Sequence, residues 1–181
     1  NGSTPTGSVW AFQKARTGNT WSAGPQLNAP TGHLGFGEGL YWSPGTLYIA
    51  SVANASNSTS YISRASMTFA DLSLTFQEEK EIQNQDVLLG EHFAGNGTVI
   101  IASGAAKEQK EGAAFLYDSD KKKSMELHPS VDDVTSGTTT SFGANVGINA
   151  GIVVIGAPDY EINGDAVGGV FIMEIPDPSA F

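Results

Sequence analysis

The segment from Asp159 to Asp165 carries the residue types best suited to binding a metal ion. Side chains that carry oxygen stand there at alternate positions: Asp159, Glu161, Asn163 and Asp165. Calcium takes carboxylate and amide oxygens, so this spacing followed by glycine is similar to the first half of a calcium-binding loop. The second half is missing, because Val170 stands at the twelfth position, where a glutamate would close the loop. We expect an acidic, solvated loop, and calcium is the one cofactor that the sequence suggests.

Aromatic side chains are a second candidate for ligand contact, because they can form stacking platforms for sugars. Tyr41 and Trp42 fall in a predicted turn and are the pair that we expect to be exposed and to bind a ligand. Trp10 and Trp21 fall in predicted strands, and we expect both to pack within the fold.

The sequence offers little to support catalysis. His33, His92 and His128 are too scattered to form a metal-binding motif, and no G-x-S-x-G nucleophile motif is present. The carboxylate pairs Glu78-Glu79 and Asp132-Asp133 are adjacent, and neighbouring residues of a strand point to opposite faces. A Ser-His-Asp triad is built in space and is not excluded by spacing, but we expect each histidine to be structural or exposed.

Composition narrows the class of protein. The chain has 181 residues, a formal net charge of −10 and a pI near 4.5, so it has no basic surface for binding nucleic acid. No apolar run approaches the roughly 18 residues that a membrane span requires. Cysteine is absent, which excludes disulfides and thiolate sites. The chain begins with Asn1 rather than methionine, which suggests a processed chain or a fragment.

Four tripeptides match the acceptor pattern for N-glycosylation, Asn-x-Ser/Thr. Their asparagines are Asn1, Asn54, Asn57 and Asn96. Most of them fall in predicted turns, where a glycan can be accommodated. We therefore expect a secreted or cell-surface glycoprotein.

Three stretches of the chain repeat one pattern. Gly37, Gly90 and Gly143 each precede a short apolar run, and both steps are 53 residues (90 − 37 and 143 − 90). The runs are Leu47–Ser51, Val99–Ser103 and Val153–Pro158. Self-similarity at such a period marks a repeat architecture, in which each unit buries its apolar face against its neighbours.

Each repeat is predicted to form four short β-strands separated by glycine-rich turns. In the third repeat, Phe142–Ile148 precedes a tight turn at Asn149-Ala150-Gly151, and Ile152–Ile155 follows as a continuous β-branched run. Such a run is typical of a strand buried on both faces. Four strands per 50-odd residues indicate an all-β fold of the β-propeller type. The predicted units are 1–30 (a partial blade), 31–83, 84–136 and 137–181 (a blade lacking its last strand).

The third repeat resembles a known family. Phe142-Gly143, Gly156-Ala157-Pro158 and Gly169-Val170-Phe171-Ile172 resemble one FG-GAP repeat, the blade of integrin α-subunit propellers. The other copies are degraded, since Ala50-Ser51-Val52 stands where Gly-Ala-Pro would be expected. Calcium in integrin propellers lies in the hairpin between the first two strands of a blade. Residues 145–151 occupy that place here without a carboxylate, so this calcium site does not carry over.

The resemblance implies a propeller that this chain leaves incomplete. About three blades and a remnant cannot close a ring, because known propellers have at least four blades. Self-association or the remainder of a longer chain would complete it. A β-trefoil, which closes with three units of this size, is the structural alternative.

Three functions follow as hypotheses. The first is a non-enzymatic extracellular module for recognition, adhesion or assembly, with a protein or glycan as its ligand. The second is a carbohydrate-active enzyme with a site on one propeller face. The third is a structural subunit of a surface filament. We favour the first, because loops on a rigid scaffold commonly carry contacts.

Overall fold

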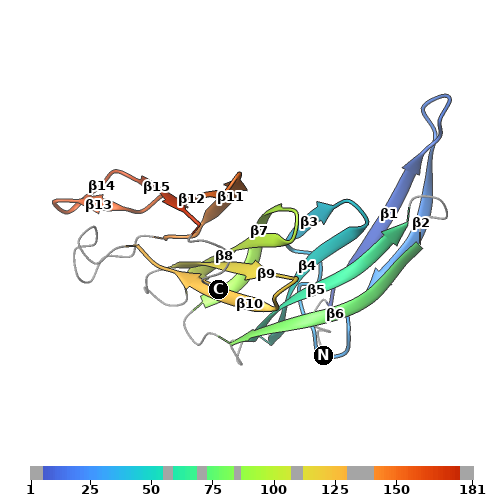
Figure 1. Cartoon of the computed structure of the whole chain (residues 1–181), viewed down its shortest axis with the longest axis horizontal. Helices are drawn as coiled ribbons and strands as arrows, with labels where there is room; N and C mark the ends of the chain where they lie inside the picture. Colours follow the sequence, from blue (N-terminus) through green and yellow to red (C-terminus); the bar gives the residue numbers. More distant parts are fainter. Residues whose placement is uncertain are drawn as a thin grey trace, which may run out of the picture.

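A computed structural model describes residues 6–54, 59–68, 73–83, 87–106, 112–129 and 141–175. These residues form strands, turns and bends, and no helix occurs among them. The prediction of an all-β fold is therefore confirmed (Figure 1).

The strands form three larger sheets and two hairpins, all antiparallel. The first sheet contains β3 (Leu40–Ser43), β4 (Thr46–Asn54), β5 (Thr59–Thr68) and β6 (Ser73–Gln83). The middle sheet contains β7 (Val87–Asn96), β8 (Val99–Ala106), β9 (Ala113–Asp118) and β10 (Lys123–Leu127). The terminal sheet contains β11 (Asn145–Asn149), β12 (Ile152–Ala157) and β15 (Gly169–Glu174). The N-terminal hairpin joins β1 (Ser8–Lys14) and β2 (Trp21–Asn28), and β13 (Glu161–Ile162) pairs with β14 (Asp165–Ala166).

Tight turns set the register of neighbouring strands. Ala150 and Gly151 both have positive φ, at 46° and 83°, which is the geometry of a two-residue hairpin turn. They join β11 to β12 at the place predicted for a tight turn. Gly97 has a φ of 68° in the short turn between β7 and β8. The segment Gly169-Val170-Phe171-Ile172, which is part of the FG-GAP resemblance, lies in β15.

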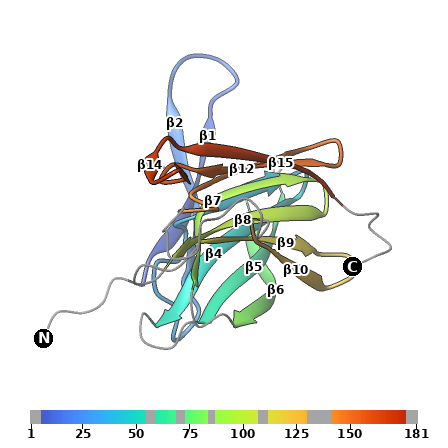
Figure 2. The same ribbon diagram turned by 90° about the vertical axis from the view of Figure 1, so that its left-hand side faces the viewer.

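The sheets are stacked in chain order (Figure 1 and Figure 2). Apolar side chains fill the layers between them. Val9 of the N-terminal hairpin packs with Leu47 and Ile49 of the first sheet. Side chains of the first and middle sheets form the second layer, which contains Tyr48, Ile62, Ile100, Ala102, Ala113, Phe115 and Tyr117. Side chains of the middle and terminal sheets form the third layer, which contains Ile101, Ala114, Leu116, Phe142, Val153, Ile155 and Ala157.

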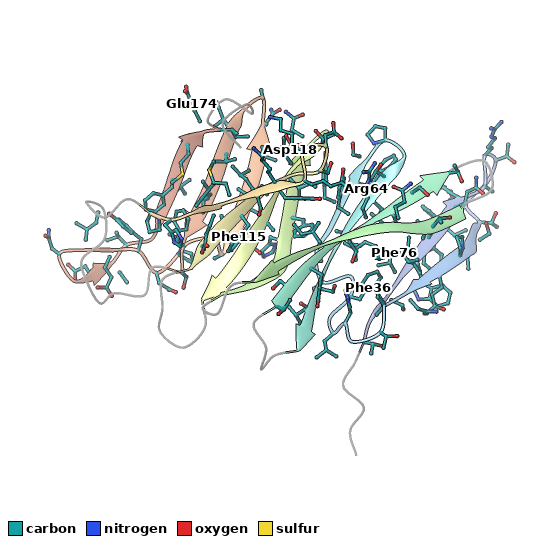
Figure 3. All side chains as sticks on the ribbon, turned by 60° about the horizontal axis from the view of Figure 1, so that its bottom comes forward. Phe36, Arg64, Phe76, Phe115, Asp118 and Glu174 are labelled. Atoms are coloured by element: carbon teal, nitrogen blue, oxygen red, sulfur yellow. The ribbon has the colours of Figure 1, made fainter. Side chains whose placement is uncertain are left out.

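The middle sheet is covered on both faces. Every residue of β9 is buried, and successive residues of this strand contribute to the second and third layers in turn. Phe115 lies in the second layer, in the interior of the stack (Figure 3). The Tyr48 hydroxyl of the first sheet also lies 2.9 Å from the Ser119 hydroxyl, which follows β9, and both residues are buried. This polar contact fixes how the first and middle sheets are placed on each other.

The Phe-Gly segments perform the same structural role in the first and third repeats. Phe36 and Phe142 are buried, and the glycine that follows each has a strongly positive φ. Gly37 donates its N–H to the carbonyl of Ala50, and Gly143 donates to that of Gly156, each at 3.0 Å. Each glycine thus donates a hydrogen bond to the residue 13 positions later (50 − 37 and 156 − 143) in its own repeat.

Two predictions about the fold are not confirmed: the propeller type and the burial of Ile152–Ile155 on both faces. The described residues show neither a closed barrel nor a closed propeller ring, so the propeller type stays a prediction. The expectation that Ile152–Ile155 is buried on both faces is wrong for this chain. Val153 and Ile155 are buried, but Ile152 and Val154 are 44% and 39% exposed, because none of the described elements covers that side of β12.

Candidate binding surfaces

The terminal sheet exposes a broad apolar face, which we call the outer face. Its strand register places these residues side by side: Asn145, Gly147, Asn149, Ile152, Val154, Gly156, Val170, Ile172 and Glu174. Val170 and Ile172 are 67% and 72% exposed. A shallow depression of 310 Å³ lies over the strands, and Val154, Gly156 and Val170 are among its lining residues. Large exposed apolar patches are typical of interaction sites, so the outer face is a candidate binding surface.

The N-terminal hairpin exposes an aromatic face at the opposite end of the molecule (Figure 1). Trp10 and Phe12 alternate along β1 with Val9 and Ala11, which are buried. Trp21 pairs with Lys14, so its side chain lies on the same side of the hairpin as Trp10 and Phe12. Trp10, Phe12 and Trp21 define the aromatic face.

The expectation that both tryptophans pack within the fold is wrong. Trp10 is 50% exposed and Trp21 is 63% exposed. The indole N–H of Trp10 donates to Ser8 Oγ at 3.2 Å, which leaves the apolar part of the ring available for contact. The described elements cover one side of the hairpin, and these two side chains lie on the other.

Tyr41 and Trp42 do not form one platform. They are neighbours on β3, so they point to opposite faces of the first sheet. Tyr41 is half-buried and stacks on Tyr48 with ring centroids 5.9 Å apart. It also lies against Gly95 of the middle sheet, where an added Cβ would come within 2.2 Å of the Tyr41 ring. Tyr41 is thus a packing residue between sheets, whereas Trp42 is 49% exposed and stays a candidate for ligand contact.

The residues predicted for calcium lie around the hairpin of β13 and β14. Asn163 and Gly164 form its turn, with φ values of 57° and 86°, which is the conformation that an Asn-Gly hairpin turn requires. Glu161 pairs with Ala166 and Asp165 pairs with Ile162, so the two carboxylates lie on opposite faces of the hairpin. Asp159 accepts a hydrogen bond from the hydroxyl of Ser141.

This arrangement does not bring the four predicted calcium ligands together. Among the residues that the structure describes, no three His, Asp or Glu side chains lie close enough together to hold a metal ion. The spacing that resembled a calcium loop is accounted for by a hairpin turn with acidic flanks. Calcium binding stays a prediction without support from the geometry.

The histidines are also dispersed. His33 Nδ1 lies 2.7 Å from Ser51 Oγ, and its ring stacks on Tyr61 at 4.2 Å. This is a serine–histidine pair, but both residues are at least 95% buried, so a substrate has no access to the serine. His128 Nε2 lies 3.1 Å from Glu126 Oε1 on the surface, at the end of β10.

One of the predicted glycosylation sites can be placed in full. Asn96 is exposed at the end of β7, and Gly97 and Thr98 form the turn that follows. A glycan on Asn96 would extend from this turn into solvent. Asn1 and Asn57 lie outside the described residues, as does the side chain of Asn54.

Sequence reasoning did not identify the outer face as a surface. The signal was present, because Ile152, Val154, Val170 and Ile172 alternate with buried residues along two paired strands. Comparisons with models of protein families, with curated proteins and with solved structures found no match to this chain. The part of the chain that the structure describes contains no helix suited to crossing a membrane.

Proposed function

We propose that this protein is a non-enzymatic recognition and assembly module that works outside the cell, built from propeller-type blades similar to FG-GAP repeats. The observation that carries the proposal is the pair of apolar faces at the two ends of one stack of sheets. Terminal units of stacked repeat proteins need a polar outer surface to remain soluble alone. Here an apolar face is exposed at each end of the described stack instead, which favours a function that works by binding a partner.

The assignment to propeller-type blades is supported by the form of the sheets. The first and middle sheets are four-stranded meanders in chain order, as in a propeller blade. The Phe-Gly segments support it too, because each docks on the preceding unit. The N–H of Phe36 donates to the Thr6 carbonyl at 3.1 Å, and Gly112 lies so close to Phe142 that an added Cβ would come within 1.8 Å of its carbonyl oxygen.

An extracellular location is supported by the acceptor at Asn96, which is exposed at the end of β7, directly before a turn. The absence of cysteine is neutral on this point. A role without catalysis is supported by the burial of His33 and Ser51, whose imidazole ring and hydroxyl group are in contact.

Binding and turnover can be measured in one assay. The chain would be produced in a host that secretes and glycosylates, labelled, and applied to an array of extracellular proteins and glycans. Soluble sugar products would be quantified in the same wells. We expect retention on at least one array member without products, and loss of retention when Val170 and Ile172 are replaced by aspartate.

The controls separate the parts of the proposal. Ile162→Thr changes an exposed apolar residue of β13 that lies outside the outer face, and it should leave retention unchanged. Release of sugar products from any glycan would overturn the non-enzymatic role. A secreted protein whose mass does not fall on enzymatic removal of N-glycans would argue against glycosylation at Asn96.

A further inference from the structure

The outer face occupies the same repeat positions as two faces that are buried inside the molecule. Tyr48, Ile101 and Val154 are each 53 residues apart (101 − 48 and 154 − 101). Tyr48 is buried against the middle sheet and Ile101 against the terminal sheet. Val154, the third member of the series, is exposed.

The neighbouring strands show the same relation. Ile62 pairs with Ala50, Ala114 pairs with Ser103, and Val170 pairs with Gly156. Ile62 and Ala114 are buried under the next sheet of the stack, whereas Val170 is 67% exposed. The outer face is therefore the surface on which a next sheet rests in this architecture, and that sheet is absent from the described structure.

The aromatic face is the matching surface at the other end. Val9 and Ala11 point toward the first sheet, which follows the hairpin in the stack. Trp10, Phe12 and Trp21 point the other way, toward the position of a preceding sheet. Among the residues that the structure describes, no element covers the outer face at one end of the stack, and none covers the aromatic face at the other end.

The two ends also carry opposite charge. Residues 1–30 contain Lys14 and Arg16 and no acidic residue, a net charge of +2. Residues 141–175 contain four acidic residues and no lysine or arginine, a net charge of −4. Lys14 lies on the aromatic face and Glu174 on the outer face, where it points away from the stack (Figure 3). Contact between unlike ends pairs opposite charges, whereas contact between two like ends brings equal charges together.

We infer that copies of this chain associate head to tail, with the outer face of one copy seated on the aromatic face of the next. This inference rests on the assembly role proposed above and names the partner as a second copy. The contact is heterologous, so it closes into a ring where the rotation between copies allows it and otherwise extends as a filament. This contact between two chains has the same form as the sheet-on-sheet layers within one chain.

Sedimentation velocity over a dilution series of the full chain tests this inference. The wild-type protein should gain mass with concentration. Two variants each remove one face: Val170→Asp with Ile172→Asp, and Trp10→Thr with Trp21→Thr. All four side chains are exposed, so each variant should fold, which circular dichroism would check. Each should weaken self-association by about tenfold or more, as loss of central apolar contacts does at other interfaces.

Mixing the two variants distinguishes head-to-tail association from other modes. Each variant keeps one intact face, so an equimolar mixture should form a dimer and nothing larger. Ile162→Thr, outside both faces, should associate like wild type. A wild-type protein that stays monomeric, a single variant that still dimerises, or a mixture that stays monomeric would each overturn the inference. If the chain stays monomeric yet is retained on the array described above, the recognition role stands and only the head-to-tail contact fails.

Discussion

At the Phe-Gly loop of the third repeat, glycine meets two separate requirements. Gly143 has a φ of 88°, in a region that residues with a side chain rarely adopt. An added Cβ would also come within 2.0 Å of the carbonyl oxygen of Ala113, in the preceding sheet. The loop thus needs glycine both for its own conformation and for close approach to its neighbour.

Gly143→Ala should therefore cost more stability than an alanine that meets only one of these requirements. Gly18 is the matched control, since its φ is 87° and no atom lies within 4 Å of its added Cβ. We expect Gly18→Ala to lower the free energy of unfolding by about 1 kcal/mol, and Gly143→Ala by about 3 kcal/mol or more, because the backbone must also shift. Urea unfolding followed by tryptophan fluorescence would measure both. Equal losses would mean that the loop does not press against the middle sheet.

At the scale of strands, the all-β class and strands such as β12 could be predicted from the sequence, whereas Tyr41 and Trp42 lie in strand β3 and not in the predicted turn. Turns that begin with glycine and runs of β-branched residues locate the strands, because each residue type suits the backbone geometry of its element. What the sequence could not provide is the identity of the covering element. Ile152–Ile155 has the composition of a strand with two covered faces, yet only the side of Val153 and Ile155 is covered. The composition of a strand indicates that its faces need to be buried. It does not indicate whether the element that covers them belongs to the same chain.

The candidate site was less predictable, for a local reason. Alternate oxygen-bearing residues around Asn163 suggested calcium, but Asn163-Gly164 is a hairpin turn that places Glu161 and Asp165 on opposite faces. An Asn-Gly dipeptide between short strands is itself a turn signal, and it competes with the interpretation as a calcium loop. Trp10 was assigned to packing from its place in a strand, although strand position alone does not decide which face is covered.

The two faces of the terminal sheet should respond differently to the same substitution. Ile155 is fully buried in the third layer, so Ile155→Ala should lower the free energy of unfolding by about 2–5 kcal/mol. Ile172→Ala, on the outer face, should change it by no more than about 0.5 kcal/mol at dilutions where the chain is monomeric. Denaturant unfolding at low concentration measures both. A large loss for Ile172→Ala in the monomer would show that the outer face is covered within one chain.

At the scale of the whole molecule, the distribution of charge along the stack matters as well as the net charge. The chain carries −10 overall, so copies repel one another at long range. Residues 1–30, with a net charge of +2, are the one predicted unit whose net charge is positive. A head-to-tail contact places this basic segment against the acidic terminal sheet, which reduces the repulsion where the copies meet.

Charge reversal at one end should therefore weaken self-association more than the same reversal elsewhere. Lys14→Glu and Lys122→Glu both change the net charge from −10 to −12, but Lys14 lies on the aromatic face and Lys122 in the turn between β9 and β10. We expect Lys14→Glu to raise the dissociation constant by about threefold relative to Lys122→Glu, the size typical of an exposed charge pair. Adding Glu174→Lys to Lys14→Glu should restore part of the affinity, because positions 14 and 174 then again carry charges of opposite sign. Sedimentation velocity at constant ionic strength measures all three. Equal weakening by both single variants would assign the effect to net charge and remove the electrostatic basis for head-to-tail order.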